Sequence, residues 1–344
     1  MKDSRLDRVR KAAAEVGAVG ALIHNPIDLG YLTGLNLSAG LLFVGKEARL
    51  YVDGRYLEAC SSAAPMPVSP LKDEVFGELP KGAIAFDSET TPYQTYQKWA
   101  AKLKLTPVPS LMKRVRSVKE PIEIERLRAA AALCGKGYDY LLTRLREGVE
   151  ERELAREFEL FCLGEGGEAL SFEPIIAFGE HGAYPHYRSA RTPLKEGDAV
   201  LLDLGFRVDR YQSDMTRVVG FGPLKPEIKK IYRIVREAME AALAILKPGV
   251  TASKLDRAAR EVITEAGYGE AFCHSLGHGV GLEVHEHPVL RDSEPYSKVA
   301  MEAGMVITIE PGIYLPGVGG VRLEDTVVVT GKGYESLTNR PFTP

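Results

Sequence analysis

Four of the chain's seven histidines lie in one glycine-rich segment, HSLGHGVGLEVHEHP, at residues 274–288. The segment contains no lysine or arginine. Neutral imidazole is a common metal ligand and also exchanges protons near neutral pH. The spacing therefore indicates a metal or acid–base site, and the alternative is a polar surface loop that happens to contain imidazoles. The four residues are His274, His278, His285 and His287.

Four acidic residues accompany strand-like apolar runs such as VLLDLG and VITIEPG. A buried ionised carboxylate is strongly destabilising unless it is paired, and we expect only Arg322 to lie close to these four. One guanidinium cannot neutralise four carboxylates, so the pattern favours divalent metal; the alternative is a set of solvent-facing acids on edge strands. Four carboxylates and one imidazole suit a pair of ions such as Mn²⁺ or Co²⁺, and Zn²⁺ or Fe²⁺ are also compatible. The four acidic residues are Asp203, Asp214, Glu310 and Glu324.

Two predicted hairpins bring these acids together. One turn is centred between Val208 and Asp209, and the other is centred on Gly317. Directly opposed residues of a hairpin have Cβ atoms about 4.5–5.5 Å apart. The predicted cross-strand partners are Asp203 with Asp214, and Glu310 with Glu324.

The same acids occupy matching places in an internal repeat. Three segment pairs match in the same order, which predicts a duplicated helix–helix–strand–strand unit related by a pseudo-two-fold axis. Each half then contributes one carboxylate from each of two strands. The pairs are 145–156 with 246–257, 197–205 with 304–312, and 214–219 with 324–329.

A smaller domain precedes the repeat. The first part of the chain alternates between helical and strand-like segments, which predicts an α/β domain with a helix over 6–16 and strands in 20–25, 39–53 and 82–87. Residues 103–117 contain two prolines and a basic cluster without a clear period, so we interpret them as a linker. The predicted domains are 1–116 and 117–344.

Two helix pairs and two groups of strands make up the second domain. Periodic apolar spacing predicts helices over 120–145, 151–167, 226–246 and 251–269. Pro121 suits the first turn of its helix, and Thr251 or Ser253 suits the cap of the last one. Strands are expected between about 172 and 220 and between about 304 and 329.

The overall composition is that of a globular protein. Of 344 residues, 45% are hydrophobic and 26% are charged, and the net charge of −3 gives no footprint for nucleic acid. No apolar run reaches the roughly 18 residues of a membrane span, and the start lacks the apolar core of a secretion signal. The four cysteines show no C-x-x-C pairing and are interpreted as buried free thiols in a reducing compartment. We therefore expect a cytoplasmic, soluble protein that binds neither membrane nor nucleic acid.

The ordered set of four acids and a histidine resembles the pita-bread metallopeptidases, a family that includes methionine aminopeptidase, aminopeptidase P and prolidase. YLTGL (31–35) and LYVDGRYLEA (50–59) are also similar to the amino-terminal domain of the proline-specific members. The resemblance covers essentially the whole chain. It implies an α/β (α+β) fold with a small amino-terminal domain and a duplicated catalytic domain.

The resemblance also implies a metal-binding role for each of the five residues. Asp203 would bind one ion alone, and Asp214 and Glu324 would bridge both ions. His278 and Glu310 would complete the second site. A hydroxide bridging the two ions would attack the scissile carbonyl.

Further residues match the family's substrate side. His186 and His285 would stabilise the developing oxyanion, and Glu310 would also carry the proton to the leaving amine. His274 matches a pocket histidine. Strand alternation places Arg322 on the face of Glu324 and Tyr314 on the face of Glu310, so both are expected to point into the site.

The function implied is hydrolysis of the Xaa-Pro peptide bond in a short peptide with proline at the second position, by an enzyme that forms a homodimer. Whether dipeptides or longer peptides are preferred stays open, as do the residue before proline and the native metal. Two rivals are a metal-independent creatinase-like C–N hydrolase and a non-enzymatic peptide-binding homologue. Three histidines lie outside this assignment. His287 and His24 are expected to be structural, and His181 either lines the pocket or lies on a surface loop.

Overall fold

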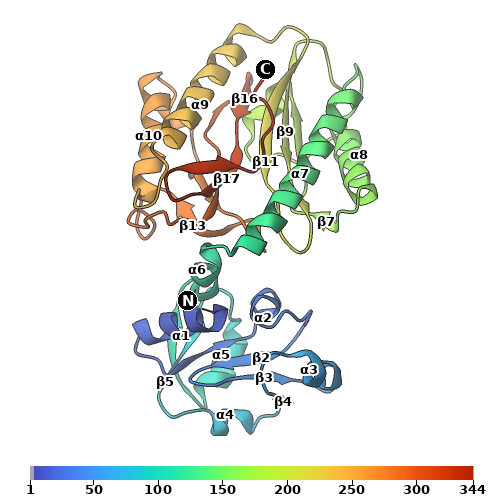
Figure 1. Cartoon of the computed structure of the whole chain (residues 1–344). Coiled ribbons are helices and arrows are strands. Elements are labelled where there is room, and N and C mark those ends of the chain that lie inside the picture. The colour runs from blue at the N-terminus through green and yellow to red at the C-terminus, as the bar shows by residue number, and fades with distance from the viewer. Residues whose placement is uncertain (1–3, 344) are drawn as a thin grey trace. The chain divides into compact units, whose positions relative to one another are not determined.

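The computed structural model describes residues 4–343 and divides into two compact units between Arg116 and Ser117. Each unit has its own β-sheets and its own apolar core. Figure 1 shows the path of the chain through both units and labels their helices and strands.

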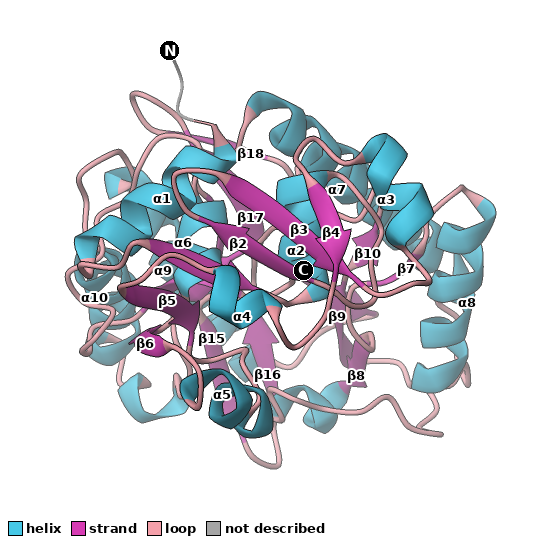
Figure 2. Cartoon of the chain, turned by 90° about the horizontal axis from the view of Figure 1, so that it is seen from below, coloured by secondary structure: helices cyan, strands magenta, loops and turns pink. Residues whose placement is uncertain are grey.

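The first unit is built on one six-stranded sheet with the order β4-β3-β2-β1-β5-β6. The β1–β2 and β2–β3 pairs are antiparallel, and the other pairs are parallel. Figure 2 shows β2, β3 and β4 side by side. The strands are β1 (Gly20–Ile23), β2 (Leu41–Val44), β3 (Ala48–Val52), β4 (Val68–Pro70), β5 (Ala83–Asp87) and β6 (Lys104–Val108).

Six helices accompany this sheet. Ser4 and Asp7 form a reciprocal capping box at the start of α1, which satisfies backbone N–H groups of the first turn. Helix α1 was predicted from the sequence, and the short helices after it were not. They are α1 (Arg5–Glu15), α2 (Pro26–Thr33), α3 (Leu57–Ala63), α4 (Val75–Glu78), α5 (Tyr93–Ala100) and α6 (Leu111–Ser117).

The interpretation of residues 103–117 as a linker is wrong. They form β6 and α6. β6 is the edge strand beside β5, and Pro107 pairs opposite Phe86 within it. An edge strand tolerates proline because one side of its backbone has no hydrogen-bond partner. The prolines therefore made this segment look unlike a strand in the sequence.

The second unit contains the predicted repeat. Its halves carry the helices α7 (Pro121–Arg144) and α8 (Glu151–Gly164), then α9 (Pro226–Ile245) and α10 (Ala252–Glu265). α8 and α10 have equal length and start 101 residues apart, at Glu151 and Ala252. Thr251 caps α10 by accepting a hydrogen bond from the backbone N–H of Lys254. Figure 1 shows α7 and α8 on one side of the strands and α9 and α10 on the other.

The strands repeat as well. The order β11-β9-β8 in the first half corresponds to β17-β14-β12 in the second, which is extended by β13 and β18. Two short pairs, β7 with β10 and β15 with β16, complete the unit. The bounds in the first half are β7 (Ala169–Leu170), β8 (Ile175–Phe178), β9 (Asp198–Leu204), β10 (Phe206–Arg207) and β11 (Met215–Phe221), with the 3₁₀ helix η1 (Gly179–Ala183). Those in the second are η2 (Gly269–Ala271), β12 (Gly277–Gly279), β13 (Glu286–Leu290), β14 (Val306–Ile309), β15 (Gly312–Leu315), β16 (Gly319–Arg322), β17 (Asp325–Val329) and β18 (Tyr334–Ser336).

One predicted hairpin register is wrong and the other is confirmed. In the first half the two-residue turn is Asp209–Arg210, closed by hydrogen bonds between Val208 and Tyr211. Asp203 therefore pairs with Thr216 instead of Asp214. Both turn residues have positive φ, as a type I′ turn requires, and neither is the Gly or Asn that would have marked the turn in the sequence.

The second hairpin has the register that the sequence predicted. Ile309 pairs with Asp325, and Gly312 pairs with Arg322. The register is the same before and after Glu310, so Glu310 lies opposite Glu324. A turn centred on Gly317, whose φ is 76°, makes that pairing possible.

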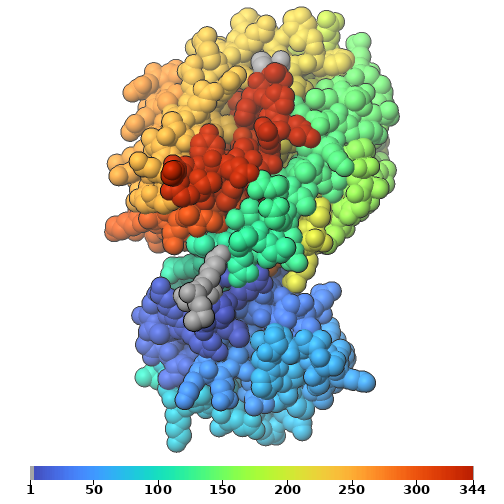
Figure 3. All heavy atoms as spheres, in the orientation of Figure 1, coloured from blue at the N-terminus to red at the C-terminus, as the bar shows by residue number. Residues whose placement is uncertain are grey.

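The last residues of the chain pack onto the second unit. Arg217 is 1% exposed, and its guanidinium donates to the carbonyl oxygens of Thr338 and Arg340 and to the carboxylate of Asp325. Figure 3 shows the carboxyl-terminal segment, in red, on the surface between the two halves. Arg217 is thus a structural anchor for this segment, one that the sequence analysis did not identify.

Candidate metal centre

Five potential metal ligands lie where the strands of both halves end. Asp203 is in β9, and Asp214 directly precedes β11. His278 is in β12, Glu310 directly follows β14, and Glu324 directly precedes β17. Four of them are less than a tenth exposed, and Glu310 is intermediate.

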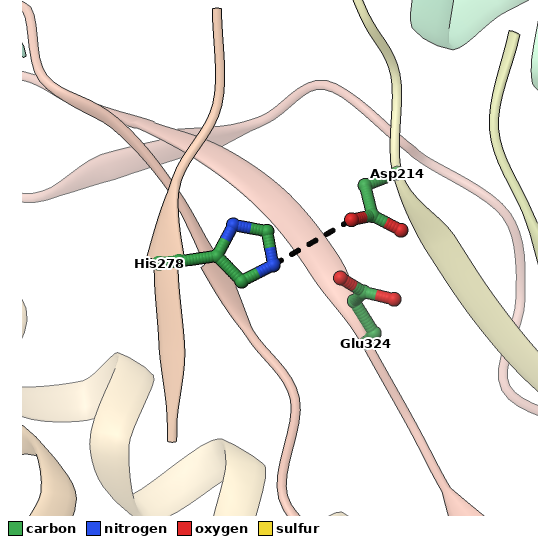
Figure 4. A group of neighbouring side chains, drawn as sticks. All are labelled: Asp214, His278 and Glu324. Atoms are coloured by element: carbon green, nitrogen blue, oxygen red, sulfur yellow. Dashed lines mark ion pairs between the residues drawn. The ribbon is translucent and has the colours of Figure 1, made fainter. Parts of the chain in front are cut away.

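The structure brings these side chains into contact. Ligand atoms of Asp214, His278 and Glu324 all lie within 4.8 Å of one another. Figure 4 shows the imidazole of His278 facing both carboxylates. His278 Nε2 is 3.6 Å from Asp214 Oδ2 and 3.2 Å from Glu310 Oε1. Asp203 joins the cluster through Arg322, which donates to its Oδ2.

Backbone contacts fix the orientation of the His278 ring. Its Nδ1 lies 3.0 Å from the carbonyl oxygen of Gly279 and donates to it in the neutral tautomer. Nε2 then presents its lone pair to the carboxylates, which is how a metal-ligating histidine is oriented. A Cβ atom at Gly277 would lie 2.1 Å from the carbonyl oxygen of Thr308, and one at Gly279 would lie 2.3 Å from that of His287. Glycine is therefore required on both sides of His278, because the neighbouring strands approach too closely for a side chain.

The cluster holds more negative charge than its protein partners neutralise. Burial raises the pKa of Asp214 and of Glu324 well above the usual range, and the neighbouring carboxylates raise both further. Burial also raises the pKa of Asp203, against the effect of Arg322. Burial has the same effect on Glu310, but the hydrogen bond and charge of His278 outweigh it and lower that pKa to about 2.

Two buried carboxylate oxygens, Asp203 Oδ1 and Glu324 Oε1, have no hydrogen-bond partner among the described residues. An unpartnered buried polar atom is costly unless a missing group satisfies it. Carboxylate oxygens without partners, a positioned imidazole nitrogen and unneutralised charge all fit divalent cations. The residues present therefore suit the metal that the sequence pattern predicted.

Arg322 connects the cluster to two residues predicted to bind substrate, Tyr314 and His274. Its guanidinium donates to Tyr314 at 2.9 Å and to Thr216 at 3.2 Å, and the Thr216 hydroxyl donates to Glu324 Oε2 at 2.7 Å. The Tyr314 hydroxyl lies 2.8 Å from His274 Nε2. Burial raises the pKa of Tyr314 to about 12, so the phenol stays protonated near neutral pH. The structure thus places Arg322, Tyr314 and His274 in one hydrogen-bonded chain.

Two threonines of the site were missed by the sequence analysis. Besides Thr216, Thr308 accepts from the backbone N–H of His278 and donates to Glu310 Oε1 at 3.2 Å. Both are fully buried inside strands, where threonine is common for reasons of packing alone. The sequence signal available was spacing: each threonine lies two residues from a candidate acid, Asp214 or Glu310, and so on the same face of its strand.

The three histidines predicted to lie on the substrate side are placed at the edge of the cluster. His285 is exposed, and its ring centroid is 4.4 Å from that of His278. His186 is exposed in the turn after η1, next to Pro185, whose carbonyl oxygen is 3.4 Å from Arg322 Nη1. His274 is half-buried, and burial lowers its pKa.

His181 and His24 have partners outside the metal cluster. His181 contacts the buried carboxylate of Glu151 and the hydroxyl of Tyr187. It is therefore neither a metal ligand in this arrangement nor a plain surface residue. His24 lies in the first unit, where Nε2 is 3.1 Å from Thr91 Oγ1 and the ring packs edge-on against Trp99.

The cysteines and the helices bear on the remaining expectations. All four cysteines are free thiols, and three are buried, but Cys273 is exposed, which corrects the expectation that all are buried. Among the described residues, no helix is both long and apolar enough to span a membrane.

Comparison with known proteins identifies the family. Residues 125–331 match the profile of metallopeptidase family M24, and residues 5–118 match the creatinase/prolidase amino-terminal domain. The chain belongs to metallopeptidase family M24. It is a metallopeptidase with the pita-bread fold, and membership implies divalent metal ions.

The relatives align from end to end. The Xaa-Pro dipeptidase of Pyrococcus furiosus is 37% identical over 341 residues, which cover 97% of each chain. The structure of an Xaa-Pro dipeptidase from Bacillus anthracis is 34% identical with a TM-score of 0.91 and covers 99% of each chain. The X-Pro aminopeptidase structure from Thermotoga maritima is 32% identical with a TM-score of 0.85 and covers 97% of this chain and 100% of the other.

Proposed function

We propose that this protein hydrolyses the peptide bond between a residue and a following proline, using two divalent metal ions held by the five clustered ligands. The observation that carries the proposal is the complete ligand cluster, with Asp214, His278 and Glu324 within 4.8 Å of one another, in a chain that aligns over its length with Xaa-Pro peptidases. Mn²⁺ or Co²⁺ suits the oxygen-rich donor set, and Zn²⁺ or Fe²⁺ is compatible with it.

In this proposal Asp203, Asp214, His278, Glu310 and Glu324 would hold the ions, with Asp214, His278 and Glu324 at the centre of the cluster. When bound, divalent metal lowers the pKa of a coordinated water and so supplies a nucleophile near neutral pH. Arg322 and Thr216 hold Asp203 and Glu324 in place through the hydrogen bonds that they donate.

The substrate side follows from the positions around the cluster. His186 and His285 are exposed beside it and can donate to the scissile carbonyl oxygen, where negative charge develops. Glu310 is a carboxylate of the cluster and can accept a proton and pass it to the leaving amine. His274, Tyr314 and Arg322 form a hydrogen-bonded wall for binding the substrate.

Similarity to the dipeptidases favours a dipeptide substrate, but an X-Pro aminopeptidase matches nearly as well. We therefore propose a broad Xaa-Pro peptidase of the short type. The creatinase-like alternative is not favoured, because the full carboxylate set is present. We further propose a homodimer in a reducing cytoplasm, where free cysteines persist.

The experiment is hydrolysis of Ala-Pro, Ala-Ala and Ala-Pro-Ala by chelator-stripped protein, with and without added Mn²⁺, Co²⁺ or Zn²⁺. Metal-restored cleavage of Ala-Pro alone would establish a dipeptidase. Cleavage of Ala-Pro-Ala with Ala-Ala spared would establish an aminopeptidase. If no metal restores cleavage of any of the three peptides, the proposed substrate class is wrong.

A further inference from the structure

The carboxylate of Glu151, at the start of α8, is 0% exposed and is not part of the metal cluster. It accepts from the backbone N–H of Phe178 at 2.8 Å and from that of Ala190 at 3.0 Å. The Tyr187 hydroxyl donates to it at 2.8 Å, and His181 Nδ1 lies 2.9 Å away. A carboxylate offers about four acceptor sites, so Glu151 is saturated.

All four donors come from one stretch of chain, residues 178–190. Phe178 ends β8, and Ala190 closes the loop that follows η1. Backbone bonds from Arg152 to Ala190 and from Glu151 to Thr192 attach the end of this loop to the start of α8. One buried side chain thus holds both ends of the loop and two side chains within it.

This loop carries His186, one residue before Tyr187. At Pro185 it also reaches Arg322, which binds Asp203. His186 lies close enough to His274 for its charge to contribute to the lowered pKa of that ring, after burial and other neighbours. The loop therefore runs from Glu151 at its base to the substrate side of the cluster at its tip.

The repeat supplies an internal comparison. An acid in the first turn of a helix is favourable through the helix dipole alone, which would be a purely local reason for Glu151. The position equivalent to Glu151 in the second half is Ala252, which is also 0% exposed. The start of α10 therefore forms without a buried acid, and the helix fold does not explain Glu151.

We propose that Glu151 is a positioning residue that orders the 178–190 loop and thereby holds His186 at the substrate side of the metal cluster. This inference rests on the proposed function for its catalytic consequence. Because burial and the hydrogen bond to Glu151 raise the pKa of Tyr187 to about 12, that phenol stays a donor over the working pH range. Glu151 acts through His186 and does not itself touch the substrate.

The test combines Glu151→Gln with His186→Ala in a double-mutant cycle on the metal-loaded, full-length enzyme. Gln has nearly the same size but offers one acceptor oxygen and an N–H₂ group that repels donors. With Ala-Pro as substrate, E151Q should lower kcat by about 10-fold, less than the roughly 10²–10³-fold expected for losing an oxyanion donor. In the H186A background the same change should lower kcat by less than about 2-fold, because residues that act as one unit are not additive.

Hydrogen–deuterium exchange gives a readout independent of turnover. In E151Q the peptides covering 178–190 should exchange faster, while β9 and β11 exchange as in the wild type and metal content is unchanged. Tyr187→Phe removes one of the four donors and should shift exchange and kcat in the same direction by less. Glu227→Gln is the matched control, since this acid also lies in the first turn of a helix and accepts from a tyrosine, Tyr268.

Equal losses of kcat in the two backgrounds, loss of metal from E151Q, or unchanged exchange over 178–190 would overturn the assignment of Glu151. If the wild-type enzyme with metal cleaves none of the peptides, the proposed function fails instead. In that case the exchange comparison alone still decides whether Glu151 orders the loop.

Discussion

Glu324 has one carboxylate oxygen held by Thr216 and the other without a partner among the described residues. That arrangement leaves one oxygen for metal and positions it through the second. Asp203 has the same arrangement, with Arg322 holding one oxygen and the other unpartnered. Glu324 also belongs to the tight group with Asp214 and His278, so among the five proposed ligands its removal is the most direct test of the site.

Glu324→Ala should abolish both metal retention and turnover. Thr216→Val, which removes only the supporting hydroxyl, should weaken metal affinity by about 10–100-fold, the scale for an outer-shell partner. Metal content by elemental analysis and hydrolysis of Ala-Pro measure the two effects. A Glu324→Ala enzyme with two ions and near-normal turnover would contradict the dinuclear proposal.

His285 tests the division between metal ligands and substrate-side groups. Its ring packs edge-on against that of His278, but His285 is exposed, whereas four of the five proposed ligands are buried. His285→Ala should therefore keep its metal and lower kcat by roughly 10²–10³-fold, as loss of an oxyanion donor does. Loss of metal from this variant would instead make His285 a ligand.

At the level of elements, the turn between β10 and β11 decides how the first pair of acids is arranged. Its two residues, Asp209 and Arg210, have φ of 47° and 72°. A non-glycine residue in this region is strained by roughly 1–2 kcal/mol. The turn is centred one residue later than predicted, which shifts each cross-strand partner by two residues. Asp203 therefore faces Thr216, and Asp214 lies outside the paired strand.

Arg210→Gly should raise the melting temperature by a few degrees, since glycine adopts positive φ without the Cβ clash. The greater freedom of glycine in the unfolded chain offsets part of this gain. Lys195→Gly is the control, because Lys195 is exposed in a loop and does not have positive φ. Thermal unfolding of both variants is the measurement, and an Arg210→Gly protein no more stable than Lys195→Gly would refute the assignment of strain to this turn.

For the whole molecule, the metal cluster links stability to pH in the metal-free protein. Asp214 and Glu324 have pKa values raised well above 3.8 and 4.5, mainly by burial. At a pH between the unfolded-state and folded-state pKa of each acid, the folded protein binds more protons than the unfolded chain. The free energy of unfolding therefore falls as pH rises through this range. Burial lowers the pKa of His278, but its hydrogen bond to Glu310 raises it by more, so the folded-state pKa lies above 6.5. The stability that protonated His278 contributes is therefore also lost as pH rises above 6.5. Glu310, with a pKa of about 2, contributes stability that is fully present above pH 4.5 and does not change in this range.

Chelator-stripped protein should therefore lose stability between about pH 5 and pH 8, and added Mn²⁺ should restore more stability at pH 8 than at pH 5. The melting temperature with and without metal at both pH values is the measurement. The double variant Asp214→Asn with Glu324→Gln removes the titrating acids and should lose most of the pH dependence. If the melting temperature of the metal-free wild type changes between pH 5 and pH 8 by no more than that of the double variant, the proposed linkage is wrong.

Local sequence patterns predicted much of the fold. The four long helices of the second unit were predicted because apolar residues recur every three or four positions over several turns. The short helices α2 to α5 escaped because a segment of four to eight residues shows too little of any period. β6 and α6 escaped because proline and basic residues at an edge resemble a linker.

The candidate acidic ligands were also predictable. An acid in an apolar strand-like run is unusual, and each acid of one half of the repeat has a counterpart at the equivalent position of the other half. The sequence did not predict how the two halves contact each other, because hydrogen bonds such as that of Thr216 with Glu324 join positions 108 residues apart. The register of the first hairpin depended on two turn residues in positive φ that carry no sequence signature. The role of Glu151 was invisible for the same reason, since a glutamate at a helix start is ordinary until folding closes four donors around it. Periodicity and composition are properties of neighbours along the chain, whereas the site is made by contacts between distant segments, and those contacts exist only once the chain has folded.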